Sequence, residues 1–523
     1  MSYQLTEFKP FYQRRIMLDL PPGSFFVYRH DNNMVLCREP TPVFAATRAD
    51  EELASADVIV VGNEAAKRYI LAGAVTAHRS LTHFLLVRLA GEMRYIEVRQ
   101  PDIAEGDTPE EVVVLEGEDW RELLCKYAEI CAEKMNAPAI DSSKTLTGYC
   151  TWYYYYANVT EKDFLENLQA MKDKQDSCYK AQVVQIDDGY QTFQGDWNDQ
   201  DPSWPTPLPE IGKRIVDSGM TAGIWLMPFQ ASTASRVFRE HPDWFVKDDN
   251  GNPIVSKGWS PPPDDMWACL DTTIPAVQEH LVKTFRTFYS WGFRYFKMDG
   301  LSFGLMPGRR SDPNATPVSA FRQGLQAIRN AVPDCHLLGC CPPYMACLGL
   351  VDSVRISDDT HASWNQIRTV FYCVLGRFWM FDRLFRCDPD VIIARQDRGS
   401  QTIGESRISA LGGIMTGISI TSDNLSVIDP DRLELLGRAA NIRMRDMKPF
   451  NWDLSRKWPD IFTGTVDGKR AVAIANVSDQ WKEYRFDEIS LDPELDAEEI
   501  LQPAGKRKYT VAVAPHDAVL LVQ

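Results

Sequence analysis

Between residue 147 and about residue 423, the sequence alternates short apolar segments with stretches of helical period. This alternation constrains the fold more than any other feature, because strands that alternate with helices form a parallel sheet covered by the helices. Most of the apolar segments end in a cluster of polar residues. The segments predicted as strands are residues 148–153, 181–186, 221–226, 268–271, 293–299, 336–340, 353–356 and 377–381.

Eight strands alternating with helices predict a (β/α)₈ barrel of the TIM type. A doubly wound sheet is the alternative architecture, but it more often has a glycine-rich phosphate turn after its first strand. No such turn follows the first predicted strand here. The expected fold class is therefore α/β, with the barrel as the catalytic domain.

Short β segments separated by turns lie on both sides of the predicted barrel. Those near the N-terminus, such as residues 25–28, 34–36 and 112–115, are typical of a β-sandwich. A helix with one apolar face is predicted from Glu118 to about Met135. The expected organisation is an N-terminal β-sandwich domain, a linking helix, the barrel and a small C-terminal antiparallel β domain, over residues 1–118, 119–140, 141–441 and 442–523.

Composition and charge narrow the class of partner. The formal net charge of −16 argues against nucleic acid or an anionic membrane and suits an enzyme of neutral small molecules. No apolar run is long enough to cross a membrane, and the first residues do not resemble a signal peptide. The twelve cysteines include no CxxC pair, so reduced thiols and a cytoplasmic location are expected. A homo-oligomer is left open.

Lys297 and Asp299 lie two residues apart at the end of an apolar strand. Period-two geometry directs both side chains to the same side of that strand. Burying an ammonium and a carboxylate there is costly, so the pair is either a structural ion pair or part of a reaction site. These five residues, 296–300, favour neither interpretation.

Further acidic residues recur where the predicted strands end, which is the edge that carries the active site in barrels of this type. A single aspartate at such a position commonly caps the next helix. Six at one rim, among tryptophan and tyrosine side chains, are harder to explain by capping. The aspartates are Asp187, Asp188, Asp271, Asp299, Asp358 and Asp359, accompanied by Lys297, Arg355, Cys340, Trp152, Tyr153 and Trp225.

Two chemistries use a rim of this kind. A divalent metal could be bound by Asp187, Asp188 and Asp299, although the ammonium of Lys297 would compete with the ion. Alternatively, two carboxyl groups could flank a glycosidic bond, one as nucleophile and one as acid/base, with aromatic walls for the sugar ring. The second hypothesis uses more of the residues and requires no cofactor or metal.

Several short motifs, in order along the barrel, resemble the α-galactosidases of glycoside hydrolase family 36. They are GYCTWYYYY at 148–156, QIDDGYQ at 185–191, GIWLMPF at 223–229, YFKMDGL at 295–301, and the stretch from LGCCPP to VRISDDT at 338–360. HPDWFV at 241–246 and DPD at 388–390 are also similar. The resemblance covers residues 147–425 by motif and the flanking domains by layout.

The resemblance implies a role for each matching residue. Asp299 matches the nucleophile, and Asp359, rather than its neighbour Asp358, matches the acid/base. Asp187 and Asp188 match the pair that binds the 4-OH and 6-OH of galactose. The remaining positions implied are Lys297 and Arg355 as hydroxyl-binding groups, Trp225, Trp152 and Tyr153 as walls of the pocket, and Cys340 near the 2-position of the sugar.

The implied reaction is a double displacement that retains the α configuration, with the two carboxyl groups about 5–5.5 Å apart. The expected enzyme is an exo-α-galactosidase that acts on melibiose or raffinose. An α-N-acetylgalactosaminidase, a raffinose-type transferase, a metal-dependent barrel enzyme and a sugar-binding protein are the alternatives. Cys341-Pro342 departs from the small residues usual after the matching cysteine, which bears on specificity at the 2-position.

Overall fold

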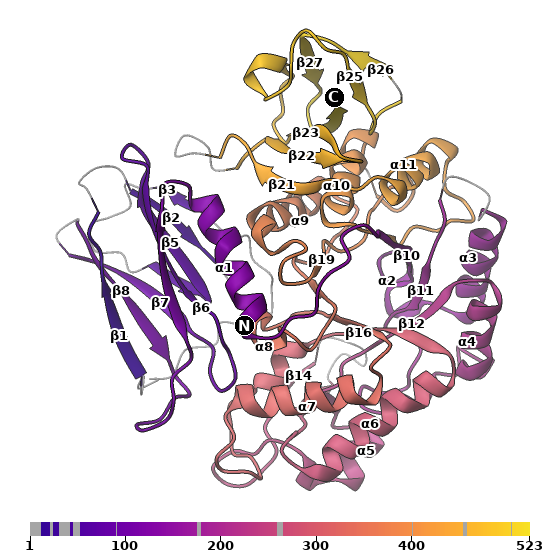
Figure 1. Ribbon diagram of the computed structural model, residues 1–523. Helices are drawn as coiled ribbons and strands as arrows, with labels where there is room; N and C mark the ends of the chain where they lie inside the picture. The colour runs from indigo at the N-terminus through magenta and orange to yellow at the C-terminus, as the bar shows by residue number, and fades with distance from the viewer. Residues whose placement is uncertain are drawn as a thin grey trace.

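The computed structural model describes residues 12–20, 25–30, 42–44, 53–89, 92–174, 179–258, 265–399, 401–452, 458–503 and 505–523. Its centre is a sheet of eight parallel strands with helices around it (Figure 1). The order around the sheet is β10, β11, β12, β16, β17, β18, β19, with β20 on the other side of β10. A parallel bridge between Ile392 and Thr421 brings the segment after β19 next to β20, so the barrel is nearly closed.

The barrel strands are short. Their bounds are β10 (Leu146–Cys150), β11 (Val183–Ile186), β12 (Thr221–Leu226), β16 (Phe293–Met298), β17 (His336–Gly339), β18 (Ser353–Arg355), β19 (Arg386–Asp388) and β20 (Ile418–Thr421). The prediction of a (β/α)₈ barrel is confirmed, because all neighbouring pairs run parallel.

The helices of the barrel begin at identifiable caps. Thr160, Thr316 and Thr402 each form a reciprocal capping box, and prolines occupy the first turn of several other helices. The helices are α3 (Glu161–Asp173), α4 (Leu208–Asp217), α5 (Arg236–Glu240), α6 (Pro275–Ser290), α7 (Pro317–Ala331), α8 (Tyr344–Cys347), α9 (Trp364–Gly376), α10 (Ile403–Thr416) and α11 (Pro430–Asn441).

Two of the eight predicted barrel strands are wrong. Residues 268–271 overlap β15 (Met266–Cys269), which pairs antiparallel with β13 (Gln230–Ser232) and β14 (Val255–Lys257) outside the barrel. Residues 377–381 contain a 3₁₀ turn, η4 (Phe378–Met380), rather than a strand. Both runs are apolar because they are buried, and burial alone does not determine which sheet a segment joins. β19 and β20 take the two places.

Two antiparallel sheets precede the barrel and confirm the predicted β-sandwich (Figure 1, indigo). One contains β1 (Tyr12–Met17), β8 (Glu92–Gln100), β7 (His83–Leu89) and β4 (Leu53–Ala56). The other contains β3 (Pro42–Phe44), β2 (Phe25–Arg29), β5 (Val58–Asn63), β6 (Arg68–Ala74) and β9 (Val112–Gly117). Ile59 and Val61 of one sheet share a core with Phe84 and Ile96 of the other. The predicted strand at 34–36 lies outside the described residues.

Helix α1 (Trp120–Lys134) follows the sandwich and begins at the predicted position, with Asp119 as its cap. The Tyr127 hydroxyl donates to backbone oxygens of the second sheet, so this helix packs on the sandwich. Across the contact with the barrel, the Tyr28 hydroxyl donates to the Gly376 oxygen at 2.7 Å and accepts from the Trp379 indole at 2.8 Å.

The C-terminal part is antiparallel, as predicted (Figure 1, yellow). Its larger sheet contains β21 (Arg445–Pro449), β22 (Ile461–Val466), β23 (Lys469–Asn476), β28 (Asp517–Val522), β25 (Ala497–Glu499) and β26 (Gly505–Arg507), and a second pair contains β24 (Lys482–Arg485) and β27 (Thr510–Val513). Arg407 of α10 makes a two-pronged ion pair with Asp517 of β28, both bonds 2.7 Å long, which joins this sheet to the barrel.

Candidate active site

The predicted site residues lie at the carboxyl ends of the barrel strands. Asp187 and Asp188 follow β11, Asp299 follows β16, and Cys340 follows β17. The others are Trp225 in β12, Lys297 in β16, Arg355 at the end of β18 with Asp359 four residues later, and Trp152 with Tyr153 in α2 (Trp152–Tyr155) after β10. Parallel strands place all of these on one rim.

Lys297 makes a buried ion pair with Asp187. Its Nζ lies 2.9 Å from Asp187 Oδ2, and the two side chains are 7% and 2% exposed. Burial lowers the pKa of Lys297, but Asp187 and nearby groups including Asp299 outweigh it and raise the pKa well above its usual value. The ion pair therefore joins β16 to the end of β11.

Asp187 accepts hydrogen bonds from several donors, and Asp188 accepts one from Gln191. Gln185 and the Cys150 thiol also donate to Asp187 Oδ2, and Asp187 Oδ1 accepts the Asp188 backbone N–H at 3.0 Å. Gln191 donates to Asp188 Oδ1 at 2.5 Å. Charge-assisted hydrogen bonds of this kind fix both carboxylates before any ligand binds.

The carboxylate of Asp299 is oriented by two N–H groups. The Trp225 indole donates to Oδ2 at 3.0 Å, and the backbone N–H of Gly300 donates to Oδ1 at 2.7 Å. Trp225 was predicted as a wall of the pocket, and its indole nitrogen adds a direct bond to the carboxylate. Each oxygen thus has a donor on one side and can present its remaining lone pair to the rim.

Gly300 has a structural reason to be glycine. Its φ of +58° is left-handed, and a Cβ at this position would lie 2.5 Å from Cε of Met227 and 2.9 Å from Nε2 of Gln230. The turn directs the Gly300 N–H back to the carboxylate of Asp299. The conformation of Gly300 therefore helps to fix the orientation of the Asp299 carboxylate.

Arg355 contacts most of the remaining site residues. Its Nη2 donates to Asp359 Oδ1 at 2.7 Å and to the Tyr153 hydroxyl at 3.3 Å, and its Nε donates to Ser357 at 3.1 Å. Nη1 lies 3.9 Å from the sulfur of Cys340. Tyr153 was predicted as a wall, and its hydroxyl also donates to Asp359 at 3.0 Å.

Asp358 and Asp359 differ in environment. Asp358 accepts the Asp359 backbone N–H at 2.9 Å and a long bond from Gln366, so its carboxylate is directed to the backbone and to α9. Asp359 faces Arg355 and Tyr153, with 59% of its side chain exposed. Loss of hydration raises the pKa of Asp359, but Arg355 and Lys297 outweigh it, so the pKa lies below its usual value.

A second pair of carboxyl groups, Asp388 at the end of β19 and Asp390 two residues later, was not singled out from the sequence beyond its match to the family. Asp390 Oδ2 lies 2.6 Å from Arg355 Nη2, and its side chain is 3% exposed. Burial raises the pKa of Asp390 to about 6, reinforced by Asp359 and opposed by Arg355. The Asp-Pro-Asp sequence at a strand end was the available signal.

Cys340 and Cys341 lie beside Asp299. Sulfur atoms of both cysteines and a carboxylate oxygen of Asp299 all lie within 4.8 Å of one another. A hydrogen bond with Cys341 that favours the protonated Cys340 thiol, together with burial and the charge of Asp299, raises the pKa of Cys340 well above its usual value, so its thiol is protonated. Cys340 therefore lies between Asp299 and Arg355.

Two expectations at the rim need correction. The predicted strand at 148–153 ends at Cys150, and Trp152 and Tyr153 belong to the short helix α2. Asp271 does not join the site, because its carboxylate accepts the N–H and hydroxyl of Thr273 and the N–H of Ser311. Trp152 packs edge-on against Tyr156 at 5.5 Å between ring centroids.

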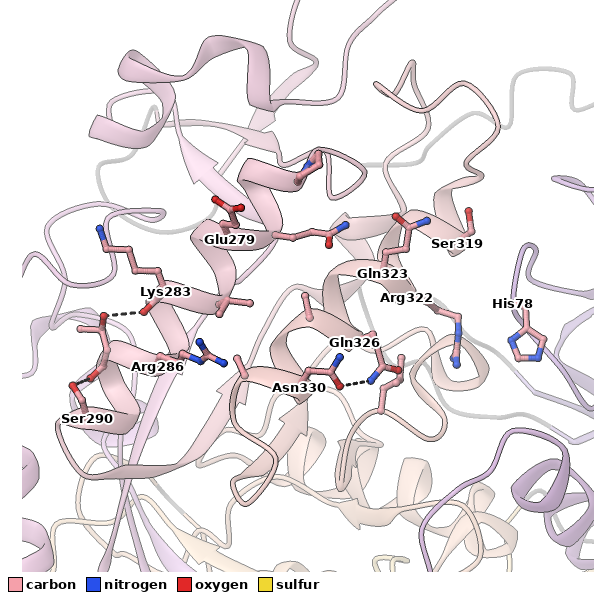
Figure 2. Close-up of a pocket in the computed structure, with 17 residues that line it drawn as sticks. His78, Glu279, Lys283, Arg286, Ser290, Ser319, Arg322, Gln323, Gln326 and Asn330 are labelled. Carbon is pink, nitrogen blue, oxygen red and sulfur yellow. Dashed lines mark hydrogen bonds between the residues drawn. The ribbon is translucent and has the colours of Figure 1, made fainter.

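A wide groove lies elsewhere on the barrel. It has a volume of about 1240 Å³ and lies between α6 and α7 on the outside of the barrel (Figure 2). Polar side chains such as Lys283, Arg286, Gln326 and Asn330 line it. It is open and holds none of the strand-end residues, so the rim remains the candidate site.

No helix within the described ranges has both the length and the apolar character to span a membrane.

Comparison with known proteins agrees with the geometry. Residues 107–286 match the family model described as Melibiase. The A type blood α-D-galactosamine galactosaminidase of Flavonifractor plautii is 29% identical over 140 residues, which are 26% of this chain and 12% of that protein. The chain therefore spans about an eighth of the length of that curated relative.

The fold is shared with solved structures over most of the chain. An α-galactosidase from Thermus thermophilus, in complex with p-nitrophenyl α-D-galactopyranoside, has a TM-score of 0.69 at 23% identity and covers 88% of this chain and 92% of its own. A family 36 α-galactosidase from Geobacillus stearothermophilus has a TM-score of 0.66 at 12% identity, covering 97% and 76%. The resemblance predicted from the motifs is thus confirmed: residues 107–286 are similar to the Melibiase family model, and the chain has the fold of family 36 α-galactosidases.

Proposed function

We propose that this chain is a retaining exo-α-galactosidase that releases terminal α-linked galactose from small oligosaccharides of the melibiose and raffinose type. The observation that carries the proposal is the pair of carboxyl groups, Asp299 and Asp359, each held by its own donors on one rim around the buried Lys297–Asp187 pair. Relatives of the same fold are α-galactosidases, one in complex with p-nitrophenyl α-D-galactopyranoside and one with stachyose.

Asp299 is proposed as the nucleophile. Its carboxylate attacks the anomeric carbon and forms a galactosyl ester while the bond to the leaving oxygen breaks. The two N–H donors of Trp225 and Gly300 hold the carboxylate in one orientation. This orientation lowers the entropy cost of reaching the transition state.

Asp359 is proposed as the acid/base. It donates a proton to the leaving oxygen in the first step and takes one from water in the second. Because Arg355 and Lys297 lower the pKa of Asp359 in the open site, the carboxyl must gain its proton as the sugar binds. A bound sugar excludes water from the exposed face of Asp359, which raises the pKa of the carboxyl.

The buried polar residues are proposed to bind the galactose hydroxyls. Asp187 and Asp188 would accept hydrogen bonds from the 4-OH and 6-OH, with Lys297 and Arg355 at further hydroxyls. Trp225, Trp152 and Tyr153 would line the pocket, and Cys340 would lie near the 2-position. The fixed carboxylates support this role, because a site built to bond hydroxyls discriminates strongly against a sugar that lacks them.

An α-N-acetylgalactosaminidase is the second candidate activity. The curated relative from Flavonifractor plautii is named as a galactosaminidase. We take Cys340, which is buried 3.9 Å from Arg355, as the residue that would crowd a 2-acetamido group, and on that ground we propose galactose as the preferred sugar. Transfer of galactose to another sugar would use the same two carboxyl groups.

The flanking domains and the location are part of the same proposal. We assign the reaction to a barrel domain of residues 141–441, with residues 1–118, the linking helix 119–140 and residues 442–523 packed around it. All ten cysteines within the described ranges are free thiols, which supports a reducing, cytoplasmic location. A carbohydrate is the proposed partner.

The test is hydrolysis of p-nitrophenyl α-D-galactoside, compared with the α-N-acetylgalactosaminide and α-glucoside. The galactoside should have the highest kcat/KM, and NMR should show α-galactose as the first product. Preference for the N-acetylgalactosaminide would replace galactose in the proposal, and β-galactose as first product would overturn the double displacement. Binding of galactose without turnover of any substrate would favour a sugar-binding protein.

A further inference from the structure

The adjacent thiols of Cys340 and Cys341 converge with the carboxylate of Asp299. Their three donor atoms lie within 4.8 Å of one another, Cys340 being buried and Cys341 partly exposed. The mechanism assigns no chemistry to either sulfur. Two sulfurs and one carboxylate oxygen are nevertheless a recognised ligand set for thiophilic metal ions.

The backbone already holds the three donors in place. The Leu301 N–H donates to the Cys340 oxygen at 3.2 Å, and the Ser302 N–H donates to the Cys341 oxygen at 3.1 Å. Asp299 is held by Trp225 and Gly300. Zn–S bonds of about 2.3 Å and tetrahedral angles put two sulfurs about 3.8 Å apart, so side-chain rotation that closes the donors by at most roughly 1 Å would complete the set.

The surrounding charge suits such a complex. Two thiolates and one carboxylate around a divalent ion carry a net charge of −1. The guanidinium of Arg355, 3.9 Å from the Cys340 sulfur, and the ammonium of Lys297 attract that charge, although each also pairs with carboxylates of the rim. The partly exposed side of Cys341 leaves a path from solvent.

We propose that Asp299, Cys340 and Cys341 form a site for one thiophilic divalent ion of the Zn²⁺ and Cd²⁺ class. Binding replaces the two S–H bonds by metal–sulfur bonds and releases two protons to solvent, with no change of oxidation state. Asp299 is the third ligand, and water fills the open fourth position. The bound ion engages the proposed nucleophile, so it and galactose exclude one another; this consequence rests on the proposed function, whereas metal binding does not.

The probe is CdCl₂ titrated into the reduced protein, read by the ultraviolet charge-transfer band of cadmium thiolate. One ion per chain should produce the band, and excess galactose should suppress it. Cys341→Ser should raise the cadmium concentration for half-formation about tenfold or more, since one thiolate bond is lost. Cys341→Ala is the second variant, in case a hydroxyl still coordinates.

Cys335→Ser is the matched control. Cys335 is also buried and precedes the same strand, β17, whose other end carries Cys340. This variant should bind cadmium as the wild type does. Wild-type binding by both Cys341 variants, or loss of the band in Cys335→Ser, would overturn the proposal.

Hydrolysis of p-nitrophenyl α-D-galactoside is measured in the same samples. Cadmium should inhibit with the same dependence as the band, and a chelator should restore the rate. If the protein forms the band but hydrolyses no galactoside, the metal site is supported and the proposed function is refuted. If the protein hydrolyses the galactoside but forms no band, the proposed function is supported and the metal site is refuted.

Discussion

Arg355 Nη2 lies 2.6 Å from the buried carboxylate of Asp390, and the same nitrogen lies 2.7 Å from Asp359. One guanidinium therefore serves two carboxyl groups, of which only Asp359 faces the open rim. The two carboxylates repel each other because both lie beside the same guanidinium. Arg355 lowers the pKa of Asp359, and the negative charge of Asp390 opposes that effect.

Removing the negative charge of Asp390 should make Asp359 a stronger acid. In Asp390→Asn the guanidinium of Arg355 no longer pairs with a charged residue 390, so the pKa of Asp359 falls in the enzyme–substrate complex. The basic limb of the kcat profile, which reports the deprotonation of the acid, should move to lower pH by about one unit. An unshifted limb with a uniformly lower kcat would mean that Asp390 only supports the fold.

The free energy of unfolding should depend on pH because of Asp390. The pKa of Asp390 rises from 3.8 to about 6 on folding, so the folded chain retains this proton over a range where the unfolded chain has lost it. The contribution of Asp390 to the free energy of unfolding should therefore decrease as pH rises from about 4 to about 6. Chemical denaturation of wild type and Asp390→Asn across this range isolates that contribution, and parallel curves would contradict the assignment.

The adjacent aspartates allow a matched test of the acid/base. Asp359→Ala should lower kcat on melibiose by about 10²–10⁴-fold, and less on substrates with activated leaving groups that need no proton. Asp358→Ala should stay within about tenfold of wild type, since its carboxylate is directed to the backbone and Gln366.

Azide distinguishes the proposed role of Asp359 as acid/base from that of Asp299 as nucleophile. It should rescue Asp359→Ala and yield the α-galactosyl azide, because the small anion attacks the galactosyl ester without a base. In Asp299→Ala any azide product should have the β configuration, since no ester forms. Equal rates for wild type and both variants would refute the assignment.

The buried ion pair predicts a large stability effect. Lys297→Met leaves the carboxylate of Asp187 buried without its ammonium and should lower the free energy of unfolding by about 3–5 kcal/mol. Asp187→Asn combined with Lys297→Met should regain part of that loss, because no uncompensated charge remains. Denaturant unfolding of the wild type and the two variants measures both effects.

Chelation distinguishes the glycosidase from a metal-dependent barrel enzyme. The Lys297 ammonium is bound to Asp187 at the position where a divalent ion would need that carboxylate. Dialysis against EDTA should therefore leave kcat unchanged. Loss of activity that Mg²⁺ or Mn²⁺ restores would support the metal-dependent alternative.

Where the sequence had strong local signals, the predicted fold is confirmed. Capping residues such as Asp119 and Thr160 mark the starts of α1 and α3, and the apolar run at 221–226 is β12 over the same residues. The apolar runs at 268–271 and 377–381 were assigned to the wrong element. Their hydrophobicity reports burial, whereas strand pairing depends on neighbours far along the chain.

The sequence by itself determined the alternation of elements and the polar residues at strand ends, because side-chain period and capping are local properties. It predicted twelve side chains at one rim, of which Asp271 does not join the site. Only the tertiary structure decided how those side chains pair. Lys297 binds Asp187 rather than Asp299, Trp225 donates to Asp299, and Arg355 joins Asp359 to Asp390. These contacts join different strands, and the closing of the barrel brings them within hydrogen-bonding distance.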